Sequence, residues 1–184
     1  MSESALLTSV TLSSQVKNHI LNLIAEQKLT PGMPVPSEVQ LIQKLGVSRG
    51  IVREAYRSLA ALGILETHSG KVPRIKKFDD EVLRVVFGFA LATEQVTTEQ
   101  ILQVRRWLEL GVVEAAARNG EEEDFANLRA EMAKIREQFN DVESFITHDI
   151  RFHQLLAVAS KNPLFMMLLQ ALHQQLRQSI QEGL

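Results

Sequence analysis

Two short helical segments joined by a tight turn constrain the fold of this chain more than any other feature. Ser37 is followed three residues later by Gln40, the pairing of a capping box at the start of a helix. Gly46 ends that helix in a tight turn, because glycine adopts a positive φ at little cost. Ser48 then follows as a natural N-cap for a second helix. Two helices joined by about four residues that include a glycine predict a helix-turn-helix.

The elements around this pair complete a small domain over residues 1–78. Apolar residues at helical spacing predict a first helix over residues 13–29, and the proline-rich TPGMPVP then predicts a turn or a short extended arm. After the pair, residues 64–78 predict two short strands around a glycine-containing tip. The second helix of the pair should bury one apolar stripe, formed by Val52, Tyr56 and Leu59.

The remaining residues, 79–184, predict only helices. Segment 79–92 is apolar on most sides, so we expect it to be buried between other elements. The next helix, over residues 97–120, should turn one apolar stripe towards the core, formed by Ile101, Val104, Leu108 and Val112. We therefore expect a mainly α protein, in which a winged helix-turn-helix over residues 1–78 precedes an all-α helical bundle over residues 79–184.

The composition excludes several classes of protein. The chain contains no cysteine, so disulfides and thiolate metal sites are excluded. No apolar run approaches the roughly 18 residues that a membrane helix needs. The N-terminal MSESALLTSVTLSSQ lacks the basic start and apolar core of a secretory signal. We therefore expect a cytoplasmic protein that does not interact with a membrane.

Charge is divided unevenly along the chain. Residues 1–78 hold ten Lys or Arg and five Asp or Glu, a formal net charge of +5. Residues 79–184 hold ten Lys or Arg and seventeen Asp or Glu, a formal net charge of −7. This asymmetry indicates that the N-terminal domain is the part that meets a polyanion. The predicted hairpin tip, His68–Lys71, is small, polar and cationic, so it can lie along a nucleic-acid groove.

Three arginines repeat every four residues in the second helix of the pair. If the apolar stripe faces the core, Arg49 and Arg53 project outward near the N-terminal end, where such helices contact base edges. The helix start at Ser48 also offers unpaired N–H groups to a phosphate. Arg57 lies farther along, facing the DNA backbone or solvent. The alternative is that these arginines are only solvated, or are paired with their acidic neighbours, Glu38 and Glu54.

The stretch LTPGMPVPSEVQLIQKLGVSRGIVREAYRSLAALGIL resembles the GntR-type winged helix-turn-helix repressors of bacteria, and the match covers residues 14–78. The matching positions are Pro31-Gly32, Pro36-Ser37-Glu38, Leu41, Leu45, Val47-Ser48-Arg49, Val52-Arg53-Glu54-Ala55, and Leu59 before Gly63. The resemblance implies that Ser48, Arg49 and Arg53 touch DNA, with Gly70 at the tip of the wing. We expect the whole DNA interface to comprise Ser37, Glu38, Ser48, Arg49, Gly50, Ile51, Arg53, Arg57, Ser69, Gly70 and Lys71.

Three positions depart from the family pattern. Val39 stands where many members carry a third DNA-contacting arginine. Gly50 and Ile51 replace the common Thr-Pro or Thr-Thr pair. These departures change the operator sequence that we expect, and they leave DNA binding itself as the prediction.

The helical remainder is similar to the FCD-type effector domain of the FadR subgroup, through QVRRWLELGVVEAAA and HDIRFHQLLAVASKNPLF. The similarity implies that Asp149 and His153, which share one helix face, are two ligands of a divalent metal such as zinc, manganese or nickel. Two further His ligands usually come from a later segment, and the chain ends at Leu184 before it, so we expect an incomplete domain. A surface hydrogen bond between Asp149 and His153 is the alternative.

Arg105 matches the position that often meets an effector carboxylate in such domains. The resemblance therefore implies a small-molecule effector, a carboxylate or a sugar acid. The alternative is a salt bridge between Arg105 and Glu109, one helical turn away.

Together these features predict a metabolite-responsive repressor that binds a palindromic DNA operator as a homodimer and senses its effector in the helical domain. Two alternatives remain, a metal-dependent enzyme built around Asp149 and His153, and a protein-interaction module in the helical domain. The enzyme is the weaker alternative, because no nucleophile–base pair and no catalytic Glu motif accompany those two residues.

Overall fold

The computed structural model describes residues 11–68 and 70–182, and the chain divides into two compact units, residues 1–82 and 83–184. The sequence placed this boundary at residue 78. The next residues belong to the first unit because Lys76 Nζ lies 2.8 Å from Asp79 Oδ2 and also pairs with Glu81. In addition, the Val82 side chain covers Gly63, where an added Cβ would lie 3.2 Å from Val82 Cγ2.

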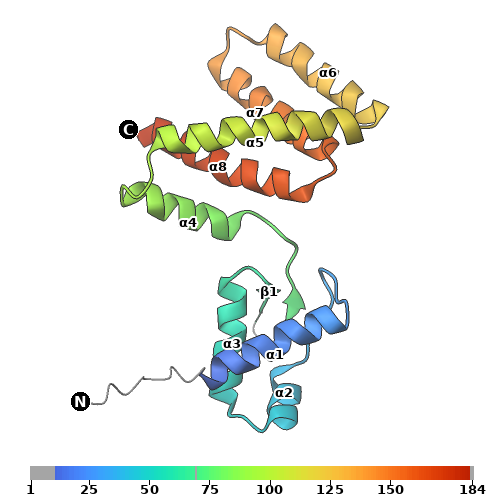
Figure 1. The fold of residues 1–184 in the computed structure, drawn as a ribbon, viewed down its shortest axis with the longest axis vertical. Coiled ribbons are helices and arrows are strands. Elements are labelled where there is room, and N and C mark those ends of the chain that lie inside the picture. Colours follow the sequence, from blue (N-terminus) through green and yellow to red (C-terminus); the bar gives the residue numbers. More distant parts are fainter. Residues whose placement is uncertain (1–10, 69, 183–184) are drawn as a thin grey trace, which may run out of the picture. The chain divides into compact units, whose positions relative to one another are not determined.

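The first unit contains three helices and a two-stranded antiparallel sheet (Figure 1). Its elements are α1 (Leu12–Glu26), α2 (Glu38–Leu45), α3 (Arg49–Ala61), β1 (Leu65–Glu66) and β2 (Arg74–Ile75). They share one hydrophobic core, which includes Ile20 of α1, Leu41 of α2 and Val52 of α3, each fully buried. The predicted stripe of α3 is confirmed, since Val52, Tyr56 and Leu59 all lie in this core.

Local sequence signals account for the ends of α2 and α3. Ser37 N donates to Gln40 Oε1 at 2.7 Å, and Gln40 N donates to Ser37 Oγ at 3.3 Å, so the predicted capping box is present. Gly46 ends α2 with a φ of 65°, and Ser48 Oγ accepts a hydrogen bond from Ile51 N at 3.4 Å. These contacts confirm the helix-turn-helix expected from the sequence.

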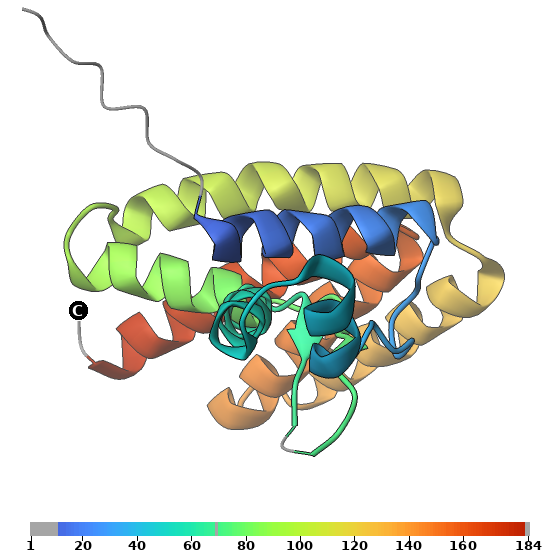
Figure 2. The same cartoon turned by 90° about the horizontal axis from the view of Figure 1, so that it is seen from below.

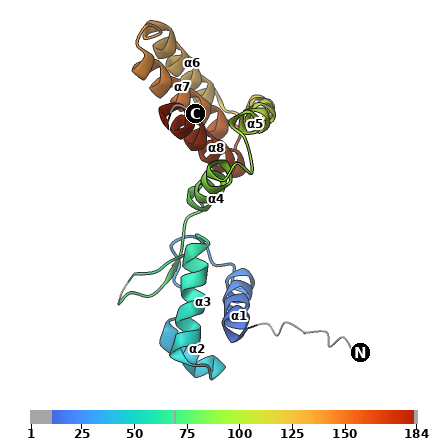
Figure 3. The same cartoon turned by 90° about the vertical axis from the view of Figure 1, so that its left-hand side faces the viewer.

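The predicted extended arm lies alongside the hairpin. Gly32 N donates to Ile75 O at 2.8 Å, and Val35 N donates to Pro73 O at 2.9 Å. The Arg74 guanidinium also donates to Gly32 O at 2.6 Å. The hairpin is therefore fixed at its base, while the loop between its strands extends away from the three helices (Figure 2, Figure 3).

The second unit is helical throughout its described part. It contains α4 (Glu81–Ala92), which begins just before the boundary, α5 (Thr98–Asn119), α6 (Glu122–Glu137), α7 (Val142–Ala159) and α8 (Pro163–Glu182). Helix α7 packs against α5, α6 and α8. Pro163 begins α8, as expected for a residue that has no N–H to donate at a helix start.

Two sequence expectations for this unit are wrong. Helix α4 has no buried residue, although its sequence predicted burial on most sides. The stripe of α5 that faces the core includes Ile101, Leu108 and Val112, but Val104 is exposed. Arg105 lies closer to that stripe, and its side chain is only 17% exposed. A helical repeat of 3.6 residues allows either position 104 or 105 in the stripe, and only packing decides between them.

The predicted fold class is confirmed, because the chain is mainly helical and carries one small two-stranded sheet. None of the helices in the described part of the chain could span a bilayer, because none combines sufficient length with sufficient apolar character.

Candidate nucleic-acid interface

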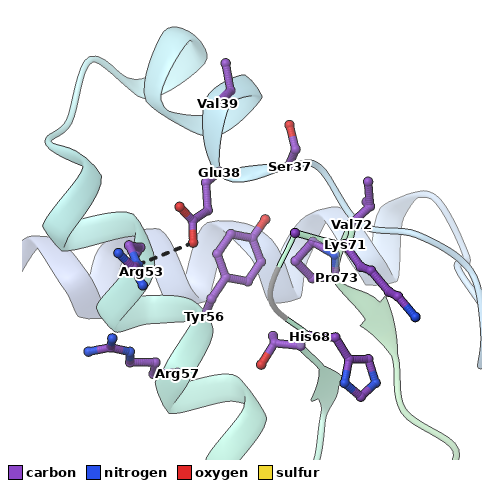
Figure 4. Close-up of a pocket in the computed structure, with 12 residues that line it drawn as sticks. Ser37, Glu38, Val39, Arg53, Tyr56, Arg57, His68, Lys71, Val72 and Pro73 are labelled. Carbon is purple, nitrogen blue, oxygen red and sulfur yellow. Dashed lines mark ion pairs between the residues drawn. The ribbon is translucent and has the colours of Figure 1, made fainter.

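A groove of about 560 Å³ opens between the start of α2, one face of α3 and the hairpin (Figure 4). It lies wholly within the first unit. Its lining combines cationic, polar and apolar side chains. It comprises Ser37, Glu38, Val39, Arg53, Tyr56, Arg57, Thr67, His68, Gly70, Lys71, Val72 and Pro73. Six of the predicted interface positions are therefore brought together here, from three separate segments of the chain.

The cations of the groove outnumber its one carboxylate. Arg53 Nε lies 3.7 Å from Glu38 Oε1, and both side chains are partly exposed (Figure 4). Neither Arg57 nor Lys71 has an ion-pair partner among the residues that the structure describes. The acidic pairing that the sequence left open is therefore real for Arg53, and it leaves the other two charges available to an anion.

The start of α3 presents a second group of predicted positions. Ser48, Arg49 and Gly50 are all exposed there, and Arg49 has no ion-pair partner within the described ranges. Free N–H groups and the helix dipole make such a start attractive to a phosphate. Ile51 differs from its neighbours, because its side chain packs partly against the core of the unit.

Tyr56 belongs to the groove as well as to the core, which sequence reasoning missed. Its hydroxyl donates to the carbonyl of Pro36, just before α2. Burial raises the pKa of the Tyr56 hydroxyl, and the nearby Glu38 carboxylate raises it further. Tyr56 is therefore a neutral hydrogen-bond donor that ties α3 to the segment that leads into α2.

The hairpin loop brings a small cationic edge to the groove. Lys71 N donates to His68 O at 3.1 Å and closes a turn in which Gly70 has a φ of 73°. Glycine suits this position because other residues rarely adopt a positive φ. The predicted position Ser69 lies outside the described residues.

In the second unit, the predicted effector and metal positions meet around Glu109. Arg105 Nε lies 2.8 Å from Glu109 Oε1, and His153 Nδ1 lies 3.3 Å from the same oxygen. On its other side, His153 Nε2 lies 3.7 Å from Asp149 Oδ1. The Glu109 carboxylate on α5 thus links Arg105 to His153, and through it to Asp149. From the sequence, Glu109 was expected only as the salt-bridge partner of Arg105.

The donor set around His153 fits a metal only in part. Two ligand atoms 3.7 Å apart are close to the separation of neighbouring ligands on one ion with bonds of about 2.1 Å. However, no group of three His, Cys, Asp or Glu side chains suited to hold a metal occurs within residues 11–68 and 70–182. Asp149 and His153 are therefore neighbours on one face of α7, without a third side chain that completes a metal site in the described part of the chain.

A buried carboxylate between α6 and α7 was also missed. Glu131 is 5% exposed, and its carboxylate lies 2.6 Å from His148 Nδ1 and 3.2 Å from Lys134 Nζ. Burial by itself raises the pKa of Glu131, but the hydrogen bonds from His148 and Lys134 outweigh it, so the pKa falls below its usual value. Sequence analysis gave no signal for this residue, because its partner His148 lies on another helix, seventeen residues away.

Three helices, a hairpin wing and a cationic groove between them define a winged helix-turn-helix unit, a class that binds nucleic acid through its second helix-turn-helix helix. Two family models match the chain, "Bacterial regulatory proteins, gntR family" over residues 12–74 and "FCD domain" over residues 100–183. The solved structure of Streptococcus agalactiae GntR has a TM-score of 0.67 and 26% identity, and the match covers 92% of this chain and 83% of that one.

Curated relatives agree with the family models. An uncharacterized HTH-type transcriptional regulator, YcbG of Bacillus subtilis (strain 168), is 30% identical over 164 residues, or 88% of this chain and 67% of the relative. The HTH-type transcriptional repressor NanR of Cronobacter sakazakii is 28% identical over 158 residues, or 84% of this chain and 61% of the relative. The chain thus spans about two thirds of the length of such relatives.

The chain belongs to the GntR family of bacterial regulatory proteins, and its helical unit carries an FCD domain. The family expected from the sequence is confirmed. The relatives are named as transcription regulators, which removes the metal-dependent enzyme from the alternatives.

Proposed function

We propose that this chain is a cytoplasmic, metabolite-responsive repressor that binds double-stranded DNA through the groove of its first unit. The observation that carries the proposal is the convergence of Arg53, Arg57 and Lys71 from α3 and the hairpin on one groove. Cations gathered on one groove suit a phosphate backbone, and phosphate contacts supply a large share of the affinity of such complexes. Membership of the GntR family supports the same function.

The residues of the interface take different roles in this proposal. Arg49 and Arg53 reach base edges near the start of α3, where a guanidinium can bind guanine through two hydrogen bonds. Ser48 and the free N–H groups beside it bind a phosphate. A carboxylate repels phosphate, so Glu38 acts by holding Arg53 in place and not by contacting DNA. Arg57 contacts the backbone.

A homodimer on a palindromic operator forms the second part of the proposal. It is supported by the exposed apolar side chains of α5, which include Val104, Trp107, Leu110 and Val113. Apolar area of this kind is stabilised when a partner covers it. A symmetric dimer places two recognition helices on two half-sites, and this requires a palindrome.

We infer that the effector is a carboxylate or sugar acid that binds Arg105. The support is that most of the Arg105 side chain is buried and that it already pairs with one carboxylate, that of Glu109. An anionic effector would replace Glu109 as the partner of the guanidinium. Such a ligand changes DNA affinity only if it binds the DNA-competent and the incompetent states with different affinity.

We also propose that Asp149 and His153 supply two ligands of a divalent metal. The separation of their ligand atoms supports this role, and their number is short of a complete protein site. No step of the regulatory mechanism is therefore assigned to the metal. Metal content per chain, compared between the wild type and Asp149→Ala, tests the proposal, and a metal-free wild-type chain would contradict it.

The DNA-binding proposal is tested by titrating the chain against a duplex from its own promoter at several salt concentrations. We expect affinity to fall steeply as salt rises, because bound phosphates release counterions. Arg49→Ala and Arg53→Ala should each weaken binding by about 1–3 kcal/mol, the cost of one lost base contact.

Arg118→Ala serves as the control. Arg118 is exposed on α5 and pairs with Glu114, so its loss removes one exposed cation outside the groove. The DNA affinity of Arg118→Ala should stay at the wild-type value. Unchanged affinity in both Arg49→Ala and Arg53→Ala would contradict the proposed interface.

A further inference from the structure

Val39 is an apolar side chain exposed in a groove that also presents cationic side chains. It is the second residue of α2, it is 52% exposed, and it lines the groove together with Arg53, Arg57 and Lys71 (Figure 4). Leu41 is the residue that anchors α2 in the core, with no exposed surface. The packing of the unit therefore does not require an apolar residue at position 39.

The local structure fixes the direction of this side chain. The capping box between Ser37 and Gln40 holds the first turn of α2 on either side of Val39. Valine is branched at Cβ, and in a helix one χ1 rotamer dominates. The groove therefore presents an isopropyl group in a defined position, at little cost in conformational entropy on binding.

We propose that Val39 is a specificity residue that contacts the C5-methyl group of a thymine in the bound duplex. In the major groove every base presents hydrogen-bonding groups, but only thymine adds an apolar group. Valine can neither donate nor accept a hydrogen bond, so a thymine methyl is the complementary partner. The cationic side chains of the same groove attract the polyanion that carries the thymine. This inference rests on the proposed DNA binding.

The test removes that methyl group and nothing else. Duplexes that bind the 184-residue chain are selected from a randomised library, and each thymine of the selected site is then replaced in turn by deoxyuridine. Deoxyuridine keeps the hydrogen-bonding edge of thymine. We expect at least one position at which the replacement weakens wild-type binding about fourfold, the effect of burying one methyl group. In Val39→Ala the shorter side chain should make the loss at that position clearly smaller.

Val72→Ala is the matched control, because Val72 is an equally exposed valine (48%) on the hairpin side of the same groove. This variant should keep the wild-type sensitivity to deoxyuridine. Loss of the same sensitivity in Val72→Ala would overturn the assignment to Val39. Thermal unfolding of Val39→Ala, with an unchanged midpoint, establishes that the variant is folded.

The outcomes separate this inference from the function on which it rests. If the wild type and Val39→Ala respond equally to deoxyuridine at every position, Val39 reads no methyl group. DNA binding that Arg53→Ala weakens would still stand in that case. If no duplex is selected at all, both the inference and the proposed function fail.

Discussion

Arg49, Arg53 and Arg57 are spaced one helical turn apart on α3, but their surroundings differ. Arg53 faces Glu38 at 3.7 Å, and Arg57 lines the groove without an ion-pair partner in the described part of the chain. Arg49 is exposed at the helix start. Like charges at this spacing repel one another. Glu38 relieves the repulsion on the middle one, and bound phosphates would relieve it on all three.

The packing of the first unit does not explain why position 50 of α3 is a glycine. An added Cβ would meet only Ser48 Oγ, at 3.9 Å, and the φ of Gly50 is not positive. The fold of the unit therefore tolerates a larger residue at position 50. DNA binding would explain the glycine, because the backbone can approach DNA most closely where no Cβ intervenes.

We predict that Gly50→Ala stabilises the chain and weakens its binding to DNA. Alanine is favoured over glycine in a helix by about 0.5–1 kcal/mol, so the free energy of unfolding should rise by up to that amount. The added methyl group should lower DNA affinity. Chemical denaturation and a duplex titration measure the two effects.

Gly111→Ala is the control for this prediction. Gly111 lies inside α5, and its added Cβ would be in ordinary contact with Phe165, at 3.6 Å. This variant should also gain stability, but its DNA affinity should not change. Undiminished affinity in Gly50→Ala would show that DNA does not approach the backbone at this position.

At the scale of elements, helices α6 and α7 are joined by a buried hydrogen bond as well as by apolar packing. Glu131 of α6 contacts His148 of α7 and Lys134 of its own helix. Leu128 and Ala159 form part of the apolar contact between the same helices. A buried charge is stable only when it is paired, so Glu131 favours one register of α6 against α7.

Glu131→Gln should destabilise the chain by about 1–3 kcal/mol at pH 7, because a neutral amide accepts weaker hydrogen bonds from His148 and Lys134 than the Glu131 carboxylate does. The pKa of Glu131 is lowered in the folded chain, so its contribution is complete above the unfolded value of about 4.3. It is lost as the pH falls through the lower, folded value. Urea unfolding of both proteins should therefore give a difference that is large at pH 7 and shrinks below about pH 4.

Glu137→Gln provides the comparison, because Glu137 is an exposed carboxylate near the end of the same helix. Its free energy of unfolding should stay within about 0.5 kcal/mol of the wild type. A Glu131→Gln difference that persists unchanged into acid would mean that the charge of Glu131 is not the stabilising feature.

At the scale of the whole molecule, the two halves of the chain differ in charge and in exposed apolar surface. Residues 1–78 carry a formal charge of +5 and residues 79–184 a charge of −7, so a polyanion is attracted to the first half only. The second half exposes large apolar side chains on α5, of which Trp107 is 74% exposed. An exposed tryptophan is a common anchor of protein interfaces.

Trp107→Glu should therefore weaken the proposed homodimer. Loss of a buried tryptophan anchor costs about 2 kcal/mol or more, so the dissociation constant should rise at least about thirtyfold. Sedimentation or light scattering over a range of concentrations measures this change. Ala126→Glu places the same charge on an exposed site of α6 and should leave the dimer intact. A wild-type chain that stays monomeric at micromolar concentration would contradict the dimer.

The sequence by itself determined most of the first unit. The capping box at Ser37, the turn at Gly46 and the N-cap at Ser48 depend on hydrogen bonds between residues at most four apart. Such contacts form wherever the local sequence allows them, so they could be predicted without the rest of the chain. The positions of Arg49 and Arg53 followed from the same pattern, because the buried stripe of α3 fixes its outer face.

Only the tertiary structure decided which helix faces and side chains of the second unit meet. Arg105 replaces Val104 beside the core, no residue of α4 is fully buried, and Glu131 reaches His148 across seventeen residues. In the first unit, Tyr56 reaches the carbonyl of Pro36 and so joins the groove to the core. These contacts join residues on different elements, and helical periodicity cannot choose between neighbouring positions until two helices pack.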